Sequence, residues 1–199
     1  GYTKMLSIFG TDFDGDGTKE IVTTGYNSSS KSMGLIFVWN YTDGVVTQEA
    51  NISFTTGNTE LESVFGADFD NDGVKEIVTT GYNSSSKSMG LIFVWNYTNG
   101  NIEQEANISF TTGNTRIESV FGADFDNDGT KEIVTTGYND SYGNYGILFV
   151  WNYSNEIIIQ EANVSWTVGS KSYIFSIFGT DFNKDNIEEL IVTGYDYLN

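Results

Sequence analysis

The stretch KEIVTTGYNSSSKSMGLIFVWNYT occupies residues 19–42 and returns unchanged at residues 75–98. It belongs to a longer repeat that is marked by Phe-Gly pairs. These pairs stand at residues 9–10, 65–66, 121–122 and 178–179, at steps of 56, 56 and 57 residues. A period of this length indicates a repeat architecture. We therefore predict a single domain over residues 1–199, made of repeats 1–56, 57–112, 113–169 and an incomplete repeat 170–199.

Each repeat has the pattern of four short strands, because runs of apolar and β-branched residues alternate with turn sequences. In the second repeat we expect strands at residues 62–69, 76–82, 91–97 and 102–110. Residues 91–97, LIFVWNY, carry apolar side chains on both faces, which indicates a strand buried on both sides. Four strands per unit, repeated every ~40–60 residues, are typical of a β-propeller blade.

The predicted fold class is all-β, a β-propeller of four-stranded antiparallel blades. About three and a half blades, or fourteen strands, lie in this chain. A sandwich or a β-solenoid is the structural alternative. The last repeat stops after two strands, and such a half blade presents an unpaired edge. We expect protein partners, or copies of this chain, to complete the propeller.

Composition excludes several kinds of function. The net charge is −18, and neither Cys nor His occurs. Proteins that bind nucleic acid carry a basic surface, so no nucleic-acid partner is expected. Without Cys and His there are no disulfides, no thiolate or imidazole metal ligands and no Ser-His triad. Hard cations bound by oxygen remain. No apolar run approaches the roughly 18 residues that a membrane span needs, so we expect no transmembrane segment.

An acidic loop separates the first two strands of every repeat. Its four copies are DFDGDGTKE at 12–20, DFDNDGVKE at 68–76, DFDNDGTKE at 124–132 and DFNKDNIEE at 181–189. Oxygen side chains stand at loop positions 1, 3 and 5, an acid stands at position 9, and the backbone carbonyl at position 7 can add a ligand. About six oxygens suit Ca²⁺. The predicted ligands are Asp12, Asp14, Asp16, Thr18, Glu20, Asp68, Asp70, Asp72, Val74, Glu76, Asp124, Asp126, Asp128, Thr130, Glu132, Asp181, Asn183, Asp185, Ile187 and Glu189.

These loops could instead be solvated acidic turns. Four copies in matching register argue against that reading, because carboxylates crowded into one turn repel each other without a cation. We predict up to four Ca²⁺ ions, one per repeat, in a structural role. The fourth site should be weaker, because Asn183 replaces an acid and Asn186 replaces a Gly that tolerates a left-handed backbone. The Phe at position 2 of each loop should anchor the loop in the core.

The string FG-x-DFD-x-DG-x-KEIVTTGY resembles the FG-GAP repeat of integrin α-subunit propellers and their microbial relatives. Here the sequence TTGYN replaces the family's GAP at residues 23–27, 79–83 and 135–139. The resemblance implies propeller blades whose calcium loop joins the first two strands. It also implies an extracellular or cell-surface module, stabilised by calcium, with structural, adhesive or protein-interaction roles. A lectin-like, carbohydrate-binding propeller is the alternative, with glycans as partners. We expect no enzyme, because metal occupies the obvious carboxylates.

Other features recur with the repeat. Glycosylation sequons start at Asn27, Asn40, Asn51, Asn83, Asn96, Asn107, Asn139, Asn152 and Asn163. The recurrent aromatic and acidic residues are Trp39, Trp95, Trp151, Tyr26, Tyr82, Tyr138, Glu49, Glu105 and Glu161. We expect the Trp residues to pack between blades rather than to stack on sugars. The Tyr residues could line a ligand site or cap a turn, and the Glu residues are read as a solvated face.

Overall fold

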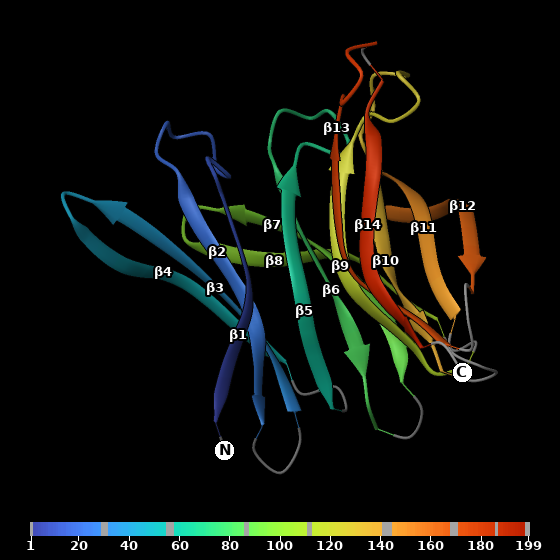
Figure 1. Ribbon diagram of the computed structural model, residues 1–199. Helices are drawn as coiled ribbons and strands as arrows, with labels where there is room; N and C mark the ends of the chain where they lie inside the picture. Colours follow the sequence, from blue (N-terminus) through green and yellow to red (C-terminus); the bar gives the residue numbers. More distant parts are fainter. Residues whose placement is uncertain are drawn as a thin grey trace.

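The computed structural model describes residues 2–28, 32–54, 58–85, 88–110, 113–140, 145–167, 171–185 and 187–197. These residues form fourteen strands and no helix (Figure 1). The strands are β1 (Thr3–Thr11), β2 (Glu20–Ser28), β3 (Ser32–Thr42), β4 (Val45–Phe54), β5 (Thr59–Ala67), β6 (Glu76–Asn83), β7 (Met89–Thr98), β8 (Asn101–Phe110), β9 (Thr115–Ala123), β10 (Glu132–Asn139), β11 (Tyr145–Ser154), β12 (Ile157–Trp166), β13 (Lys171–Thr180) and β14 (Glu189–Tyr197). The predicted all-β class is confirmed. No helix in the described part of the chain could span a membrane.

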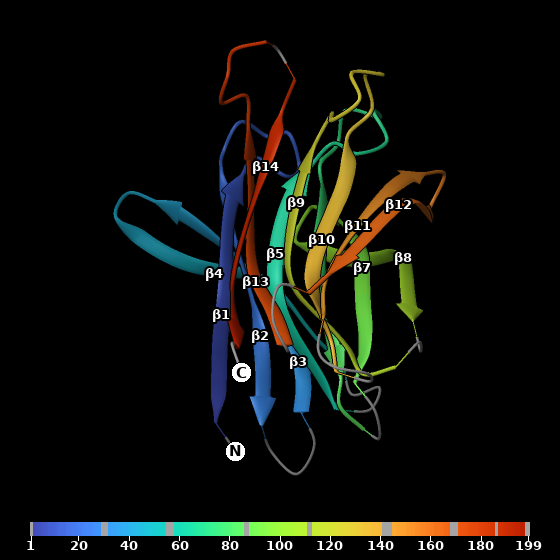
Figure 2. The same cartoon turned by 45° about the vertical axis from the view of Figure 1, so that its right-hand side comes forward.

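The strands form four antiparallel sheets in chain order. Three are four-stranded meanders, β1–β4, β5–β8 and β9–β12, and the last is the pair β13–β14. The first strands β1, β5, β9 and β13 lie side by side, and β4, β8 and β12 lie away from them (Figures 1 and 2). Each first strand after β1 packs on the preceding sheet, so the extensive contacts between described strands of different sheets join neighbours along the chain.

Three of the four strands expected in the second repeat agree closely with β6, β7 and β8. The prediction for the first strand was wrong at both ends, because β5 spans Thr59–Ala67 rather than 62–69. The backbone turns away from the strand at Asp68. There the Phe69 N–H donates to a Glu76 carboxylate oxygen, Oε2, at 2.8 Å, so Phe69 belongs to the loop and not to the sheet.

Trp95 and Trp151 pack between sheets, as predicted, whereas Trp39 is half-buried and stacks on Phe37 of its own strand. Trp95 is 2% exposed, and Phe54 of the preceding sheet lies 5.6 Å from it between ring centroids. The Trp95 indole Nε1–H donates to Thr79 Oγ1 at 2.9 Å, which satisfies its one polar atom. Trp151 of the third sheet repeats this arrangement. Its ring packs against Phe110 of the second sheet, and its indole N–H donates to Thr135 Oγ1. No surface is left on these two buried rings for a sugar.

The interpretation of Glu49, Glu105 and Glu161 as a solvated face holds for Glu49 and Glu161, which are exposed, whereas Glu105 is half-buried. The sequence analysis missed that Glu49 and Glu105 also bind the next sheet. The Tyr97 hydroxyl donates to Glu49 Oε2 at 2.8 Å, and the Tyr153 hydroxyl donates to Glu105 Oε2 at the same distance of 2.8 Å. Each bond joins the fourth strand of one sheet to the third strand of the next. Charge-assisted hydrogen bonds are the stronger kind, so these pairs tie the outer parts of adjacent sheets together.

The second and third Phe-Gly pairs need their glycine, because an aromatic ring occupies the space that a side chain would fill. A Cβ atom added to Gly66 would stand 2.4 Å from Cε1 of Phe13, the second residue of the preceding acidic loop. Gly122 and Phe69 repeat this contact at 2.5 Å. Phe13 and Phe69 are 1% and 0% exposed, which confirms the predicted core anchor in the first two loops, whereas Phe182 of the fourth loop is 48% exposed. Any larger residue at the glycine would displace the ring.

A third link between sheets is a backbone-to-serine hydrogen bond. The Val64 N–H donates to Ser7 Oγ at 3.2 Å, and the Val120 and Ile177 N–H groups donate to Ser63 and Ser119 at 3.3 Å. Each of these serines follows a break in strand register on its first strand. A β-bulge re-aims the side chains beside it, which turns the serine toward the next sheet.

Candidate metal centres

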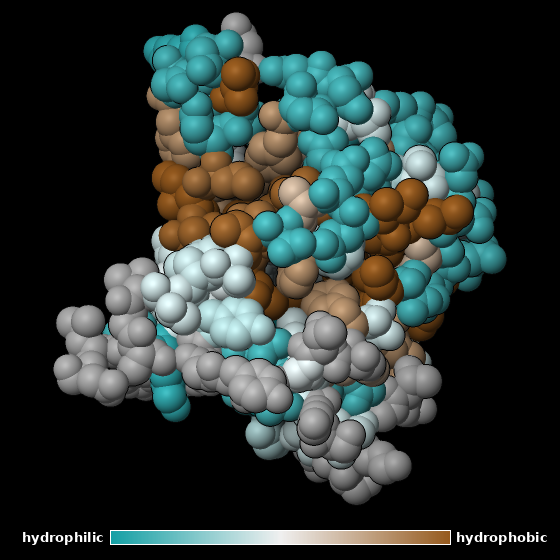
Figure 3. Space-filling view, turned by 90° about the vertical axis from the view of Figure 1, so that its right-hand side faces the viewer, coloured by the Kyte–Doolittle hydropathy of each residue, from teal (hydrophilic) through white to brown (hydrophobic). Residues whose placement is uncertain are grey.

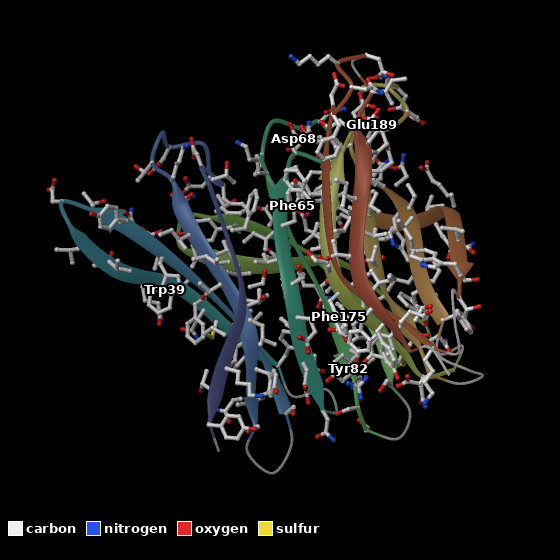
Figure 4. All side chains as sticks on the ribbon, viewed as in Figure 1. Trp39, Phe65, Asp68, Tyr82, Phe175 and Glu189 are labelled. Carbon is white, nitrogen blue, oxygen red and sulfur yellow. The ribbon has the colours of Figure 1, made fainter. Side chains whose placement is uncertain are left out.

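The four acidic loops connect the first and second strands of the four sheets. Figure 4 shows Asp68 and Glu189, from the second and fourth loops, at the same end of the molecule. Two hydrogen bonds join neighbouring loops directly. The Lys75 ammonium donates to the Asp12 carbonyl oxygen at 3.0 Å, and the Asn71 side-chain amide donates to the Gly129 carbonyl oxygen at 2.8 Å. The first three loops therefore form a connected row.

Each loop is shaped by its own carboxylates. In the second loop the Gly73 N–H donates to Asp68 Oδ2 at 3.1 Å and the Val74 N–H donates to Asp72 Oδ1 at 2.7 Å. The first and third loops repeat both bonds, and position 5 of the fourth loop accepts the same bond from Ile187. In the first two loops one oxygen of the position-1 acid is thus used to fold the turn, and the other is left for a ligand. In the third loop Asp124 Oδ1 also accepts a hydrogen bond, from the Asp128 N–H at 3.1 Å.

Carboxylate oxygens converge in all four loops. Within each group, oxygens lie within 4.8 Å of one another. The groups are Asp12, Asp14 and Glu20; Asp68, Asp70 and Glu76; Asp124, Asp126, Asp128 and Glu132; and Asp181, Asp185 and Glu189. Positions 1 and 9 belong to every group, and position 5 belongs only to the last two. Asp16 and Asp72 lie outside their groups. The position-5 acid accepts the position-7 N–H in all four loops, whether or not it belongs to its group. The predicted carbonyl ligands at position 7 stay predictions.

Two carboxylate oxygens in these groups are orphaned. Asp12 Oδ1 and Asp68 Oδ1 are buried and have no hydrogen-bond partner within the described residues. A buried acceptor without a partner costs about 1–3 kcal/mol, and more when it is charged. A cation at the centre of each group would satisfy both atoms. The donor set is oxygen alone, and the orphaned atoms lie where the predicted metal belongs, so the residues fit Ca²⁺.

The position-9 acid is the most perturbed group of the second loop. Burial raises the pKa of Glu76 to about 8, and the negative charge of Asp70 also raises it. The pKa of Asp70 is itself raised by burial and by Asp72 and Asp68. A bound cation would favour the ionised forms, so metal and protons compete for this site.

The backbone of the loops is left-handed at position 6, where the Gly residues were expected to allow it. It is left-handed at a second position as well. Gly17, Gly73 and Gly129 have φ values of 91°, 94° and 93°. Position 4 is also left-handed, which the sequence analysis missed. Its residues are Gly15, Asn71, Asn127 and Lys184, with φ values of 72°, 61°, 59° and 67°. Gly and Asn at this position were the available signal, because they tolerate such a backbone.

The fourth loop departs from the other three. The Asn183 side-chain amide donates to Glu189 Oε1, an oxygen that could otherwise bind metal. Lys184 holds a left-handed φ of 67°, which is unfavourable for a long side chain. Position 6, Asn186, lies outside the described residues. The predicted weakness of this site remains a prediction, and these features favour it.

The sequons differ in their exposure. Asn51, Asn107 and Asn163 are exposed, and five others are half-buried: Asn27, Asn40, Asn83, Asn96 and Asn152. Asn139 is only 5% exposed, and its amide donates to Thr115 Oγ1 at 2.9 Å. A glycan could not be attached at Asn139 without breaking this contact, so we leave it out of the proposed acceptors.

A second charged cluster lies far from the loops, around Tyr82. The Tyr82 hydroxyl donates to Glu60 Oε2 at 2.8 Å, and the Arg116 guanidinium lies 4.3 Å above the Tyr82 ring. Tyr82 is thus a structural link between sheets, which favours the non-ligand reading of the repeated Tyr. Sequence reasoning missed the cluster. The available signal was a difference in charge between repeats two and three. The two repeats are identical over 62–73 and 118–129, but they carry Glu60 and Arg116 at the equivalent position just before these segments.

Two carboxylates of this cluster should make stability depend on pH. Burial raises the pKa of Glu62 to about 7, helped by Glu60 and opposed by Arg116. Burial also raises the pKa of Glu118 to about 7, helped by Glu62. In an unfolded chain a Glu titrates near ~4.3. Between these two pKa values the folded state binds more protons than the unfolded chain. The free energy of unfolding therefore falls as the pH rises from ~4.5 to ~7.

We expect Glu62→Gln to raise the free energy of unfolding by roughly 1–3 kcal/mol at a pH of about 8, and to change little at a pH of about 4.5. The amide keeps the shape of the side chain and removes its charge. Urea unfolding in saturating calcium measures the difference. Glu103→Gln, on an exposed position of β8, is the matched control. Parallel pH profiles for Glu62→Gln and the wild type would contradict the assignment.

Residues 12–79 match the family profile described as the FG-GAP-like repeat. The chain contains an FG-GAP-like repeat. The match runs from the first acidic loop into β6, so it includes two of the four loops. No curated protein matches the FG-GAP-like chain.

Solved structures of three lyases share the fold of this FG-GAP-like chain. Rhamnogalacturonan lyase PL11 of Bacillus licheniformis is 14% identical, with a TM-score of 0.64 over 95% of this chain and 40% of the lyase. The exotype rhamnogalacturonan lyase YesX is 17% identical, with a TM-score of 0.66 over 98% of this chain and 39% of the lyase. For rhamnogalacturonan lyase YesW the values are 15%, 0.65, 98% and 41%. The neighbours are β-propeller-like, and this chain spans about two fifths of their length.

Proposed function

We propose that this chain is a calcium-stabilised β-propeller module with a structural, adhesive or protein-interaction role outside the cell or at its surface. The observation that carries the proposal is the pair of orphaned oxygens, Asp12 Oδ1 and Asp68 Oδ1, inside carboxylate groups that recur in all four repeats. The repetition supports a holding role. Each proposed ion would clamp the first strand of a sheet to the second.

Charge supports the same proposal. The chain carries a net charge of −18, and four bound Ca²⁺ ions would bring it to −10. Extracellular calcium modules bind with dissociation constants of about 10⁻⁴–10⁻³ M, which suits loops that leave part of their oxygen set to the backbone. The exposed sequons at Asn51, Asn107 and Asn163 suit the same compartment.

We propose binding rather than catalysis. The structural neighbours are lyases named for rhamnogalacturonan, but this chain spans about two fifths of each. Its clustered carboxylates are near-copies of one another in the loops, where they have the geometry of ion clamps. We expect no cleavage of rhamnogalacturonan, as followed by the ultraviolet absorbance of unsaturated products. Turnover that a loop variant such as Asp68→Asn abolishes would overturn this part of the proposal.

Carbohydrate binding is the second candidate. A pocket of about 170 Å³ in the third sheet is lined by Asn139, Tyr145, Phe149 and Asn163, among others. Aromatic and amide side chains together suit a sugar. Tyr145 is one of the lining residues, and its counterparts in the first two repeats are Met33 and Met89. A glycan array in calcium tests this candidate. Loss of a hit on Tyr145→Ala would support it, and an array without hits would exclude it.

Calcium titration tests the main proposal. Isothermal calorimetry of the metal-free chain should show three strong sites and one weaker site. Asp68→Asn should remove one strong site, because it replaces a charged ligand whose other oxygen also folds the loop. Asp43→Asn, in the exposed turn between β3 and β4, is the matched control and should keep every site. Equal stoichiometry for Asp68→Asn and the wild type would contradict the assignment of this loop.

A further inference from the structure

The second acidic loop contacts the loops on both sides of it through side chains that are not predicted metal ligands. Lys75, at loop position 8, donates from its ammonium group to the Asp12 carbonyl oxygen at 3.0 Å. Asn71, at loop position 4, donates from its side-chain amide to the Gly129 carbonyl oxygen at 2.8 Å. Figure 3 shows hydrophilic residues gathered at the end of the molecule where the loops lie. At this end, the second loop holds the main chain of both neighbouring loops.

The bond from Lys75 fixes a peptide group that joins two proposed ligands of the first metal centre. The peptide between Asp12 and Phe13 has its carbonyl oxygen held by Lys75. The N–H of the same peptide donates to Glu20 Oε2 at 2.8 Å. Asp12 and Glu20 both belong to the first carboxylate group, and Asp12 Oδ1 is the orphaned oxygen of that group. A change in the tilt of this peptide would therefore move both ligands.

The bond from Asn71 acts in the same way on the third metal centre. The peptide between Gly129 and Thr130 has its carbonyl oxygen held by Asn71. The N–H of this peptide donates to Asp128 Oδ1 at 2.7 Å. Both ends of the peptide are thus fixed, one by the second loop and one by a carboxylate of the third. The position of Asp128 depends on this arrangement.

The carboxylate groups of the loops differ at position 5. Asp128 of the third loop belongs to its group, whereas Asp72 of the second loop lies outside its group. The third loop is held by a side chain at position 4 of the preceding loop, but the second loop follows Gly15, which has no side chain. The fourth loop follows Asn127, and its position 6 lies outside the described residues. The bond from the preceding loop thus accompanies the group of four acids.

We propose that Lys75 and Asn71 are positioning residues for the neighbouring metal centres, Lys75 for the first and Asn71 for the third. The inference rests on the proposed calcium sites and adds two residues that bind no ion themselves. Removal of a group that orients metal ligands typically weakens metal binding by roughly 10–100-fold. By linkage, calcium at either neighbour also holds the matching side chain of the second loop, so the three centres load as a coupled set.

A calcium titration followed by nuclear magnetic resonance tests each centre separately. The amides of Gly17, Gly73 and Gly129 lie in the first three loops, and each donates to the position-1 carboxylate of its own loop. Asn71→Gly should raise the calcium midpoint at Gly129 by about 10-fold and leave the midpoint at Gly17 unchanged. Glycine keeps the left-handed backbone, because Gly15 holds the equivalent position with a φ of 72°. Asn99→Gly, in an exposed turn with a φ of 51°, is the matched control and should change neither midpoint.

Lys75→Met should have the complementary effect, raising the midpoint at Gly17 by about 10-fold and leaving that at Gly129 unchanged. Loss of a positive charge alone would have the opposite sign, because a cation near the centre repels calcium. Lys75→Arg keeps a cationic donor and should restore most of the affinity. Lys131→Met is the matched control, because Lys131 holds the same position in the third loop without such a bond to the second loop within the described residues.

The selectivity of the two variants separates positioning from general destabilisation, because a loosened chain would bind calcium more weakly at every centre. An unchanged midpoint at Gly129 for Asn71→Gly, or at Gly17 for Lys75→Met, would overturn that residue's assignment. Equal rises at all three glycines would overturn both assignments and leave the proposed function standing. A wild-type chain in which calcium shifts none of the three amides would overturn the proposed function as well.

Discussion

Excess EDTA should lower the melting temperature of the calcium-loaded chain by roughly 15–30 °C. At a free ion concentration 100 times the dissociation constant, each site adds about 2.7 kcal/mol to the free energy of unfolding. Three complete sites then add about 8 kcal/mol. For a chain of this size, 1 kcal/mol shifts the melting temperature by about 2–4 °C. Differential scanning calorimetry measures the shift.

The control for this experiment is EDTA already saturated with calcium, which has the same ionic strength and should leave the melt unchanged. A loop variant adds a second check. Asp68→Asn should lose about a third of the shift, and Asp181→Asn, in the weaker fourth loop, should lose less. If free EDTA and calcium-saturated EDTA give the same melt, calcium does not stabilise this fold.

The substitution Phe69→Ala should destabilise the chain by about 3–5 kcal/mol, the usual effect of deleting a buried aromatic ring. Phe69 is fully buried, and its ring fills the space against Gly122. The hydrogen bond to Glu76 comes from the Phe69 backbone, so the substitution leaves that bond in place. The effect should therefore come from lost packing between the second and third sheets.

Phe182→Ala is the matched control, because it changes the same repeat position where the ring is 48% exposed. We expect it to cost less than about 1 kcal/mol in dilute solution. Urea unfolding in saturating calcium measures both changes. Equal losses for the two variants would mean that the loop aromatic acts within its own loop and not across the boundary between sheets.

Sequence reasoning predicted the features that lie within one repeat. The β-branched run in residues 76–82 and the apolar run in 91–97 are local, and both became strands close to the expected extent. The acids of the loops are local too, and positions 1 and 9 meet in every repeat. The end of β5 was misplaced because Asp68 and Phe69 look like a continuation of the strand, and only the bond to Glu76 draws them into the turn.

Features that join two repeats were harder to predict. Glu49 and Tyr97 are 48 residues apart, and no pattern in either segment shows that their side chains meet. The same holds for Tyr82 and Arg116, which belong to different sheets. The orphaned oxygens of Asp12 and Asp68 also required three-dimensional information, because burial and hydrogen bonding decide whether a carboxylate lacks a partner.

The identity of residues 19–42 and 75–98 creates a problem of assembly. These segments form the second and third strands of the first two sheets, so the strands themselves cannot distinguish a correct partner from a copy. The distinction must come from the first and fourth strands, which differ between these two sheets. On the first strands, Lys4, Glu60 and Arg116 give successive sheets different charges. A newly made chain therefore risks exchanging hairpins between blades, a characteristic failure of repeat proteins. The different charges of these three side chains would help each first strand to pair with its own second strand during folding.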